Sequence, residues 1–137
     1  MEEEQIVNYL NDLYQNIMDE LTMAEDEYSP YDAENQHYLV EIKSRDTKYD
    51  SWIIQEDKYE TNLTLAAESG RKFIYLNEYK GNIHTWNITD LTNSDYNFNW
   101  TERPMPTTTR FENTENKSKR VGYLYEADAK VHTKEIL

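Results

Sequence analysis

The sequence predicts a mixed α/β (α+β) domain with a central mixed β-sheet flanked by helices. Three features predict this class: an amphipathic helix at the N-terminus, β-prone apolar runs after it, and a second helix between two of those runs. The resulting order of helix, strand, strand, helix, hairpin, loop and strand favours one sheet with a helix on each face. With 137 residues, three glycines and three prolines, we expect a single domain spanning 1–137.

The first predicted helix rests on apolar residues that recur at steps of three and four. The helix is expected to run from about Glu3 to about Met23. Acids at its start suit the positive end of the helix dipole, whereas Asp19 and Glu20 near its far end do not, which indicates another role there. Ser29-Pro30 should end any helix before Asp32. The apolar positions are Ile6, Val7, Leu10, Leu13, Tyr14, Ile17 and Leu21.

The predicted central strand is the apolar run from Gln36 to Arg45, which carries an acid and a base at alternate positions. Side chains alternate faces along a strand, so Glu41 and Lys43 should project together, about 7 Å apart. A short hairpin through residues 34–36 would bring Asp32 alongside them. The sequence therefore predicts a cluster of two carboxylates and a lysine.

The later elements are predicted from β-prone runs and turn residues. A glycine C-cap at Ser69-Gly70 is expected to close the second helix. The predicted elements are a strand at 51–54, a helix from Glu56 or Asp57, strands at 72–76 and 83–88 joined by a turn at 80–82, a polar loop at 93–99, an extended segment at 104–106 and a last strand at 121–125.

Charge is distributed unevenly along the chain. The net charge is −13, but residues 1–35 hold eleven of the 27 acids and no Lys or Arg, so the remainder is nearly balanced. A local basic groove that binds a DNA backbone is therefore compatible with the acidic total. The candidate DNA-binding residues are Arg103, Arg110, Lys117, Lys119 and Arg120.

Two absences narrow the classes of protein further. The sequence has no cysteine, which removes disulfides, thiolate metal sites and thiol nucleophiles. It also has no long apolar run, and its N-terminus is acidic where a targeting peptide would be basic. We expect a cytoplasmic protein that does not associate with membranes.

The chemistry expected of the cluster is that of a metal site. Glu-x-Lys occurs four times in the chain, but only the copy at 41–43 lies in an apolar strand preceded by an acid at hairpin distance. Asp32 and Glu41 would repel each other unless a cation lay between them, and carboxylate oxygens suit Mg²⁺ or Mn²⁺. Lys43 would orient a water molecule or offset charge on the phosphate. The alternative is a solvent-exposed ion pair that contributes little to stability.

Three further residues are candidates for the same site. Glu20, or its neighbour Asp19, would supply another carboxylate from the end of the first helix. Gln55 and Lys58 would reach the same edge from the start of the second helix. The three histidines share no ligand spacing, which argues against a zinc site.

These residues resemble the motif of the PD-(D/E)XK, or restriction-endonuclease-like, nuclease superfamily. The likeness covers roughly residues 5–90. It rests on Pro30-Tyr31-Asp32, on Tyr38 to Lys43, on a helix opening with Gln55 and Lys58, and on the strand Phe73 to Leu76.

The resemblance implies an endonuclease that hydrolyses phosphodiester bonds of DNA with Mg²⁺. Asp32 and Glu41 would bind the metal, Lys43 would be the catalytic lysine, and Gln55 or Lys58 the polar residue on the following helix. The interval from Asp32 to Glu41 is short for the family, and a separate strand before Asp32 is hard to find. Small proteins of this kind are often encoded by phages or mobile elements, which would place this one in an infected host cell.

A rival hypothesis comes from a different class. The eleven acids of residues 1–35 would suit a non-catalytic interaction protein, either a degenerate nuclease fold or an acidic mimic of DNA. A nuclease requires Asp32, Glu41 and Lys43 to converge, whereas a mimic requires acids along an exposed face. A homodimer that cuts both strands, or a partner protein that adds basic surface, also remains open.

Overall fold

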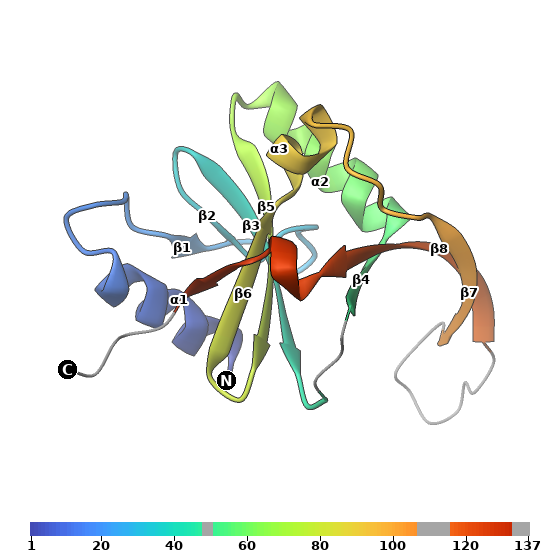
Figure 1. The fold of residues 1–137 in the computed structure, drawn as a ribbon. Coiled ribbons are helices and arrows are strands. Elements are labelled where there is room, and N and C mark those ends of the chain that lie inside the picture. The colour runs from blue at the N-terminus through green and yellow to red at the C-terminus, as the bar shows by residue number, and fades with distance from the viewer. Residues whose placement is uncertain (48–50, 107–115, 133–137) are drawn as a thin grey trace.

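The structure is a computed structural model that describes residues 1–47, 51–106 and 116–132, except the side chains of residues 105, 106, 116 and 117. The described residues form a mixed sheet of six strands, a second sheet of three strands and three α-helices (Figure 1). The predicted mixed α/β class is confirmed. The prediction of one sheet is wrong, because the strand at 51–55 pairs with the C-terminal half of the chain instead of joining the central sheet.

The elements have the following bounds. The helices are α1 (Glu3–Leu13), α2 (Glu56–Glu68) and α3 (Ile88–Asn93), with a 3₁₀ turn at Glu126–Asp128. The strands are β1 (Thr22–Met23), β2 (Ala33–Glu34), β3 (Tyr38–Arg45), β4 (Ser51–Gln55), β5 (Lys72–Tyr79), β6 (Asn82–Asn87), β7 (Thr101–Pro106), β8 (Asn116–Tyr125) and β9 (Lys130–His132). Helix α3 and strands β1 and β9 were not predicted.

The central sheet has the order β1-β2-β3-β5-β6-β9. Strands β3 and β5 are parallel, and the chain between them contains β4 and α2 as the crossover that a parallel pair requires. The other neighbouring pairs are antiparallel. The predicted hairpin of β5 and β6 is confirmed, with its turn at Lys80 and Gly81.

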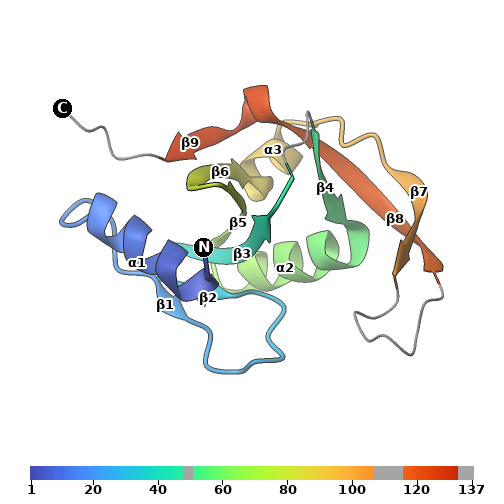
Figure 2. The same ribbon diagram turned by 90° about the horizontal axis from the view of Figure 1, so that it is seen from below.

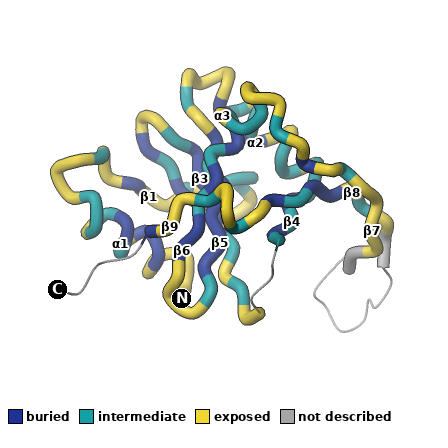
Figure 3. The backbone as a smooth tube through the Cα atoms, in the orientation of Figure 1, coloured by how far each residue is buried: buried dark blue, intermediate teal, exposed yellow. Residues whose placement is uncertain are grey.

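A helix covers each face of the central sheet, as predicted. Helix α1 packs through Ile6, Val7 and Leu10 on the face that carries Val40 and Leu76. Helix α2 packs through Ala66 on the opposite face, where Leu39, Phe73, Tyr75 and Trp86 form the larger core. Figure 2 shows the two helices on opposite sides of β3, and Figure 3 shows the buried residues concentrated along the central strands.

The first helix is shorter than predicted, and its extension to Met23 is wrong. Helix α1 ends at Leu13, and Asn16 adopts a left-handed backbone conformation with φ of 68°. An Asn side chain tolerates this conformation, which a continuing helix does not contain. Ile17 is consequently 80% exposed, while Leu21 is buried and has both backbone groups bound by the side-chain amide of Asn11. The apolar spacing continued past the point where the helix stopped.

The second helix agrees with its prediction at both ends. Helix α2 begins at Glu56 after the N-cap Gln55, and Gly70 follows the C-cap Ser69 with φ of 69°. That left-handed conformation is the one for which glycine is preferred at a helix end.

The second sheet has the order β4-β8-β7 and lies on the α2 side of the molecule. Strands β7 and β8 form an antiparallel hairpin that projects from the body at one side of Figure 1. Close packing fixes its base: Trp100 lies over Gly122, where an added Cβ would stand 2.8 Å from the ring. None of the helices in the described part of the chain combines the length and apolar character needed to cross a membrane.

Candidate functional site

Strand β3 brings Glu41 and Lys43 to the face of the central sheet that α2 covers. Glu41 is only 3% exposed, and its Oε1 lies 3.6 Å from Nζ of Lys43. Its other oxygen, Oε2, is buried and has no hydrogen-bond partner among the described residues. The alternative of a solvent-exposed ion pair is therefore wrong for Glu41.

Asp32 joins Glu41 through the predicted hairpin. Its backbone N–H donates to the carbonyl of Val40 at 2.8 Å, and its Oδ2 accepts a hydrogen bond from the N–H of Ile42 at 2.7 Å. The carboxylate thus lies beside β3, next to the residues that flank Glu41. Asp32 directly precedes β2, a strand of only two residues.

The two carboxyl groups share an unusual electrostatic environment. Burial raises the pKa of Glu41, against the opposing effect of Lys43 and Lys58, and the Asp32 charge raises that pKa further. Burial also raises the pKa of Asp32, although the bond from Ile42 and the charges of Lys43 and Lys58 oppose it. A buried Glu41 and a half-buried Asp32 are therefore both under the electrostatic influence of Lys43 and Lys58.

The start of α2 completes the site. Gln55 and Lys58 line a small cavity of about 90 Å³ together with Glu41, Lys43 and Arg45. The positive end of the helix dipole of α2 also lies at this cavity, because Gln55 is its N-cap. Residues of β3 and β5 in the central sheet and of β4 in the second sheet line this cavity, so the site lies between the two sheets.

Asn62 fixes the loop that leads into Asp32. Its side chain is fully buried in α2, and its Nδ2 donates a hydrogen bond to the carbonyl oxygen of Pro30 at 3.0 Å. The helix that presents Lys58 therefore also holds the segment that presents Asp32. An Asn in a helix gives no sequence signal of this role, because the bond joins residues 32 positions apart.

Glu3 is an acid near the site that the sequence did not single out. Partial desolvation raises the pKa of this exposed residue at the start of α1; the charge of Asp32 raises that pKa further and the charge of Lys43 lowers it. The sequence offered only its place in an acidic first turn.

Glu20, predicted as a further metal ligand, lies elsewhere. It is exposed, in the segment between α1 and β1, and not at a helix end. Within the described residues, no hydrogen bond or ion pair links it with Asp32 or Glu41. Its neighbour Asp19 contacts Gln36 and His37, in the turn just before β3.

The predicted DNA-binding residues belong mostly to the β7–β8 hairpin. Lys119 donates to Oε1 of Gln55 at 3.3 Å, which connects this hairpin with the small cavity. Arg103 is exposed and pairs in register with Lys119. Arg120 points to the other face of β8 and binds Glu56 at 2.8 Å. The Cα of Lys117 pairs with that of Met105, and Arg110 lies outside the described residues.

The comparisons with known proteins identify no family. A scan of the chain against protein-family models found no match, and a search of curated proteins found none either. The geometry of the site therefore carries the functional argument.

The donor atoms of the site fit a hard divalent cation. Asp32 and Glu41 offer carboxylate oxygens, and Oε2 of Glu41 is a buried acceptor without a partner in the described residues. No group of three or more His, Asp or Glu side chains in the described part of the chain is arranged to hold a metal ion. Mg²⁺ is commonly bound by one or two carboxylates with water and phosphate oxygens in its other positions. Mg²⁺ or Mn²⁺ therefore fits this pair, whereas a structural metal with an all-protein ligand set does not.

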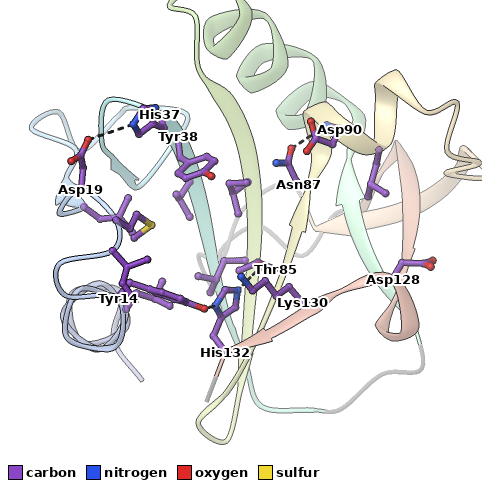
Figure 4. Close-up of a pocket in the computed structure, with 18 of the residues that line it drawn as sticks. Tyr14, Asp19, His37, Tyr38, Thr85, Asn87, Asp90, Asp128, Lys130 and His132 are labelled. Carbon is purple, nitrogen blue, oxygen red and sulfur yellow. Dashed lines mark hydrogen bonds and ion pairs between the residues drawn. The ribbon is translucent and has the colours of Figure 1, made fainter. Parts of the chain in front are cut away.

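A larger cavity, of about 740 Å³, lies on the opposite face of the central sheet beside α1 (Figure 4). Its walls are largely apolar, and its rim carries three acids that already have partners. Asp19 contacts His37, Asp90 binds Lys72, and Asp128 accepts a hydrogen bond from Tyr96.

His132 links the two sides of this larger cavity. The hydroxyl of Tyr14 donates to its Nδ1 at 2.5 Å, and its Nε2 lies 2.6 Å from Oγ1 of Thr85. Burial lowers the pKa of His132 to about 4, so the imidazole is neutral at pH 7 and its Nε2–H donates to Thr85. This chain of hydrogen bonds ties α1 to β6 and β9, and it satisfies these polar groups internally.

Proposed function

We propose that this protein is an Mg²⁺-dependent DNA endonuclease that hydrolyses phosphodiester bonds at the Asp32, Glu41 and Lys43 site. The observation that carries the proposal is the environment of Glu41, whose Oε1 lies 3.6 Å from Nζ of Lys43 and whose buried Oε2 has no hydrogen-bond partner among the described residues. Lys58 lines the same cavity, and the Asp32 carboxylate is bound beside the same strand. A buried carboxylate whose charge is only partly balanced lowers the stability of the fold, and such groups are typical of functional sites.

The chain's own residues have distinct roles in this proposal. Asp32 and Glu41 would hold the cation, which when bound polarises a phosphate oxygen and lowers the pKa of a water ligand. Lys43, with a side chain that is 44% exposed, is free to donate to a phosphate oxygen or to orient the attacking water. Lys58 and Gln55 would bind the same phosphate from the start of α2.

The β7–β8 hairpin would supply the contacts that hold the DNA backbone. Arg103 and Lys119 are cross-strand neighbours, so their side chains project from the same face. Lys119 contacts Gln55, which makes this face continuous with the small cavity. Arg120 is paired with Glu56 and has less charge to offer to phosphates.

The same geometry favours a nuclease over an acidic interaction protein. A mimic of DNA needs no buried acid, whereas Glu41 is almost fully buried beside Lys43. A homodimer or a partner protein remains compatible with the proposal.

The test is cleavage of labelled single- and double-stranded DNA in Mg²⁺ or Mn²⁺. We expect cleavage that EDTA abolishes, that Glu41→Ala abolishes, and that Lys43→Ala reduces by roughly a hundredfold or more. Lys80→Ala is the matched control, because Lys80 belongs to another Glu-x-Lys sequence at an exposed turn.

Two outcomes would contradict the proposal. Cleavage that survives Glu41→Ala would place the activity elsewhere or in a contaminant. A pure protein that cuts no DNA, and has the same Tm with and without Mg²⁺, would leave the acidic interaction protein as the better hypothesis.

A further inference from the structure

Arg45 is the third charged side chain that β3 presents to the small cavity. Glu41, Lys43 and Arg45 occupy alternate positions and therefore share one face of the strand. The Cα atoms of Lys43 and Arg45 are about 7 Å apart by the rise of a strand. Both side chains line the cavity, yet the proposed chemistry uses only Lys43.

Two buried neutral groups hold the guanidinium of Arg45. Its Nε donates to Oδ1 of Asn77 at 3.0 Å, and its Nη2 donates to the hydroxyl of Tyr75 at 3.3 Å. That hydroxyl donates in turn to the carbonyl of Ile53 at 2.9 Å. Burial raises the pKa of Tyr75 to about 12, so the phenol stays neutral and does not balance the charge of Arg45.

No carboxylate among the described residues forms an ion pair with Arg45, although Glu41 lines the same cavity. This sets it apart from Arg71, which binds Glu34 at 3.0 Å, and from Arg120, which binds Glu56 at 2.8 Å. A guanidinium that is fixed by neutral acceptors retains its charge and its remaining N–H groups for an anion.

Asn77 fixes the orientation of the Arg45 guanidinium. The Nε of Arg45 is a hydrogen-bond donor, so the side-chain amide of Asn77 must present its acceptor atom, Oδ1, to it. The amide nitrogen Nδ2 of Asn77 therefore points away from Arg45. That Nδ2 is buried and has no hydrogen-bond partner in the described part of the structure. Asn77 and Tyr75 therefore fix the guanidinium at the cavity through neutral groups, and within the described residues no carboxylate binds it.

We propose that Arg45 binds the phosphate adjacent to the one that is cleaved, so that the substrate class is a nucleic-acid strand with at least two successive phosphates. The inference rests on the proposed function. The step from Lys43 to Arg45 along β3 corresponds to about one nucleotide of a sugar–phosphate backbone. A guanidinium can bind the neighbouring phosphate with two N–H groups, which fixes the register of the strand without reading its sequence. Arg45 is in this proposal a substrate-positioning residue.

The test uses short DNA strands with one cleavable phosphodiester and phosphorothioates elsewhere. In two further strands, the linkage on the 5′ or on the 3′ side of the cleavable bond is an uncharged methylphosphonate. Each is assayed with wild type, Arg45→Met, Arg45→Lys and the matched control Lys130→Met, which removes one exposed positive charge on the far edge of the sheet. The readouts are kcat/KM in Mg²⁺ and Kd by fluorescence anisotropy in EDTA.

We expect the methylphosphonate on one side to lower kcat/KM and affinity of the wild type by roughly tenfold to a hundredfold, as for a hydrogen bond to a charged group. The same replacement should have little effect in Arg45→Met, because the contact is already absent. Arg45→Lys should be intermediate, since a lysine keeps the charge but not the planar fork, and Lys130→Met should behave as wild type.

The inference is overturned if the methylphosphonate lowers kcat/KM and affinity by the same factor in wild type and in Arg45→Met. It is also overturned if the methylphosphonate leaves both quantities unchanged in wild type. Melting temperatures show whether Arg45→Met is folded; if it is not, the comparison between wild type and Arg45→Lys decides. Arg45-dependent binding in EDTA without cleavage in Mg²⁺ would refute the nuclease proposal and leave this inference standing. If the protein cleaves DNA but the methylphosphonate lowers kcat/KM equally with and without Arg45, the Arg45 inference is refuted and the nuclease proposal stands. If the protein neither binds nor cleaves DNA, both proposals are refuted.

Discussion

Replacing Glu41 with glutamine should stabilise the metal-free protein. Glu41 is 3% exposed, Lys43 is its nearest cation at 3.6 Å, and its Oε2 has no hydrogen-bond partner among the described residues. A buried polar atom without a partner costs about 1–3 kcal/mol, and more when it is charged. Glutamine keeps the shape and loses the charge, so we expect the free energy of unfolding to rise by about 1–2 kcal/mol at pH 8. For a domain of this size the rise in Tm is roughly 3–10 °C.

The pH dependence of this difference follows from the pKa of Glu41. Burial raises that pKa above its ordinary value of 4.5, so the folded protein binds the proton more tightly than the unfolded chain. Protonation of Glu41 therefore stabilises the fold; this stabilisation is complete below the unfolded value and is lost as pH rises through the folded pKa. The advantage of Glu41→Gln should be largest at pH 8 and should shrink as pH falls toward 4.5.

Thermal unfolding followed by circular dichroism at pH 8 and pH 4.5 measures both effects. Glu60→Gln is the control, because it removes one negative charge from an exposed position of α2. Mg²⁺ should raise the Tm of the wild type and leave that of Glu41→Gln unchanged, because only a ligand that binds the folded state stabilises it. A Glu41→Gln variant that melts at or below the wild-type temperature in EDTA at pH 8 would refute the reasoning.

Two further substitutions test the supports of the site. Asn62→Ala removes the bond to the Pro30 carbonyl and should lower the free energy of unfolding by about 1–3 kcal/mol, read from the urea midpoint. It should also slow cleavage, because Asp32 loses its anchor; unchanged stability would contradict the role assigned to this bond. Gly122→Ala places a Cβ 2.8 Å from the ring of Trp100 and should cost about 1–3 kcal/mol through overpacking. A Tm equal to that of wild type would show that the ring moves aside freely.

Local sequence signals were sufficient for the core of the site. Alternation along β3 predicted that Glu41 and Lys43 share a face, and the turn residues before it predicted the hairpin that brings Asp32 alongside. The beginning and end of α2 could also be predicted from local sequence, since Gln55 precedes the first turn of the helix and Gly70 follows its last turn. These features depend on residues within about ten positions of one another.

The features that sequence did not predict depend on distant contacts. Ile53 and Ile54 predict a strand, but they do not indicate which strand it pairs with. Its partner is β8, nearly 70 residues later in the sequence. Helix α1 ended early because Asn16 turned the chain and Asn11 bound the backbone of Leu21, so the apolar stripe continued without a helix.

The sequence did not predict roles for Glu3 and Arg45, because these roles depend on residues that are distant in the sequence. The pKa of Glu3 is affected by the charges of Asp32 and Lys43, which are about 30 and 40 positions away in the sequence. Arg45 is held by Asn77 and Tyr75, which lie on the parallel neighbour β5 rather than on its own strand.

The projecting β7–β8 hairpin has a consequence for how proteins with this architecture diverge. Its base is fixed, because β8 pairs with β4 and β4 ends at Gln55 beside the small cavity. Adding two residues to each strand preserves which side chains share a face and extends the hairpin by about 7 Å. Insertions and deletions in residues 101–120 can therefore change the length and charge of the hairpin while residues 51–58 keep their geometry. Homologues of this chain should vary most in this hairpin, and substrate range can evolve there without altering the residues at the cavity.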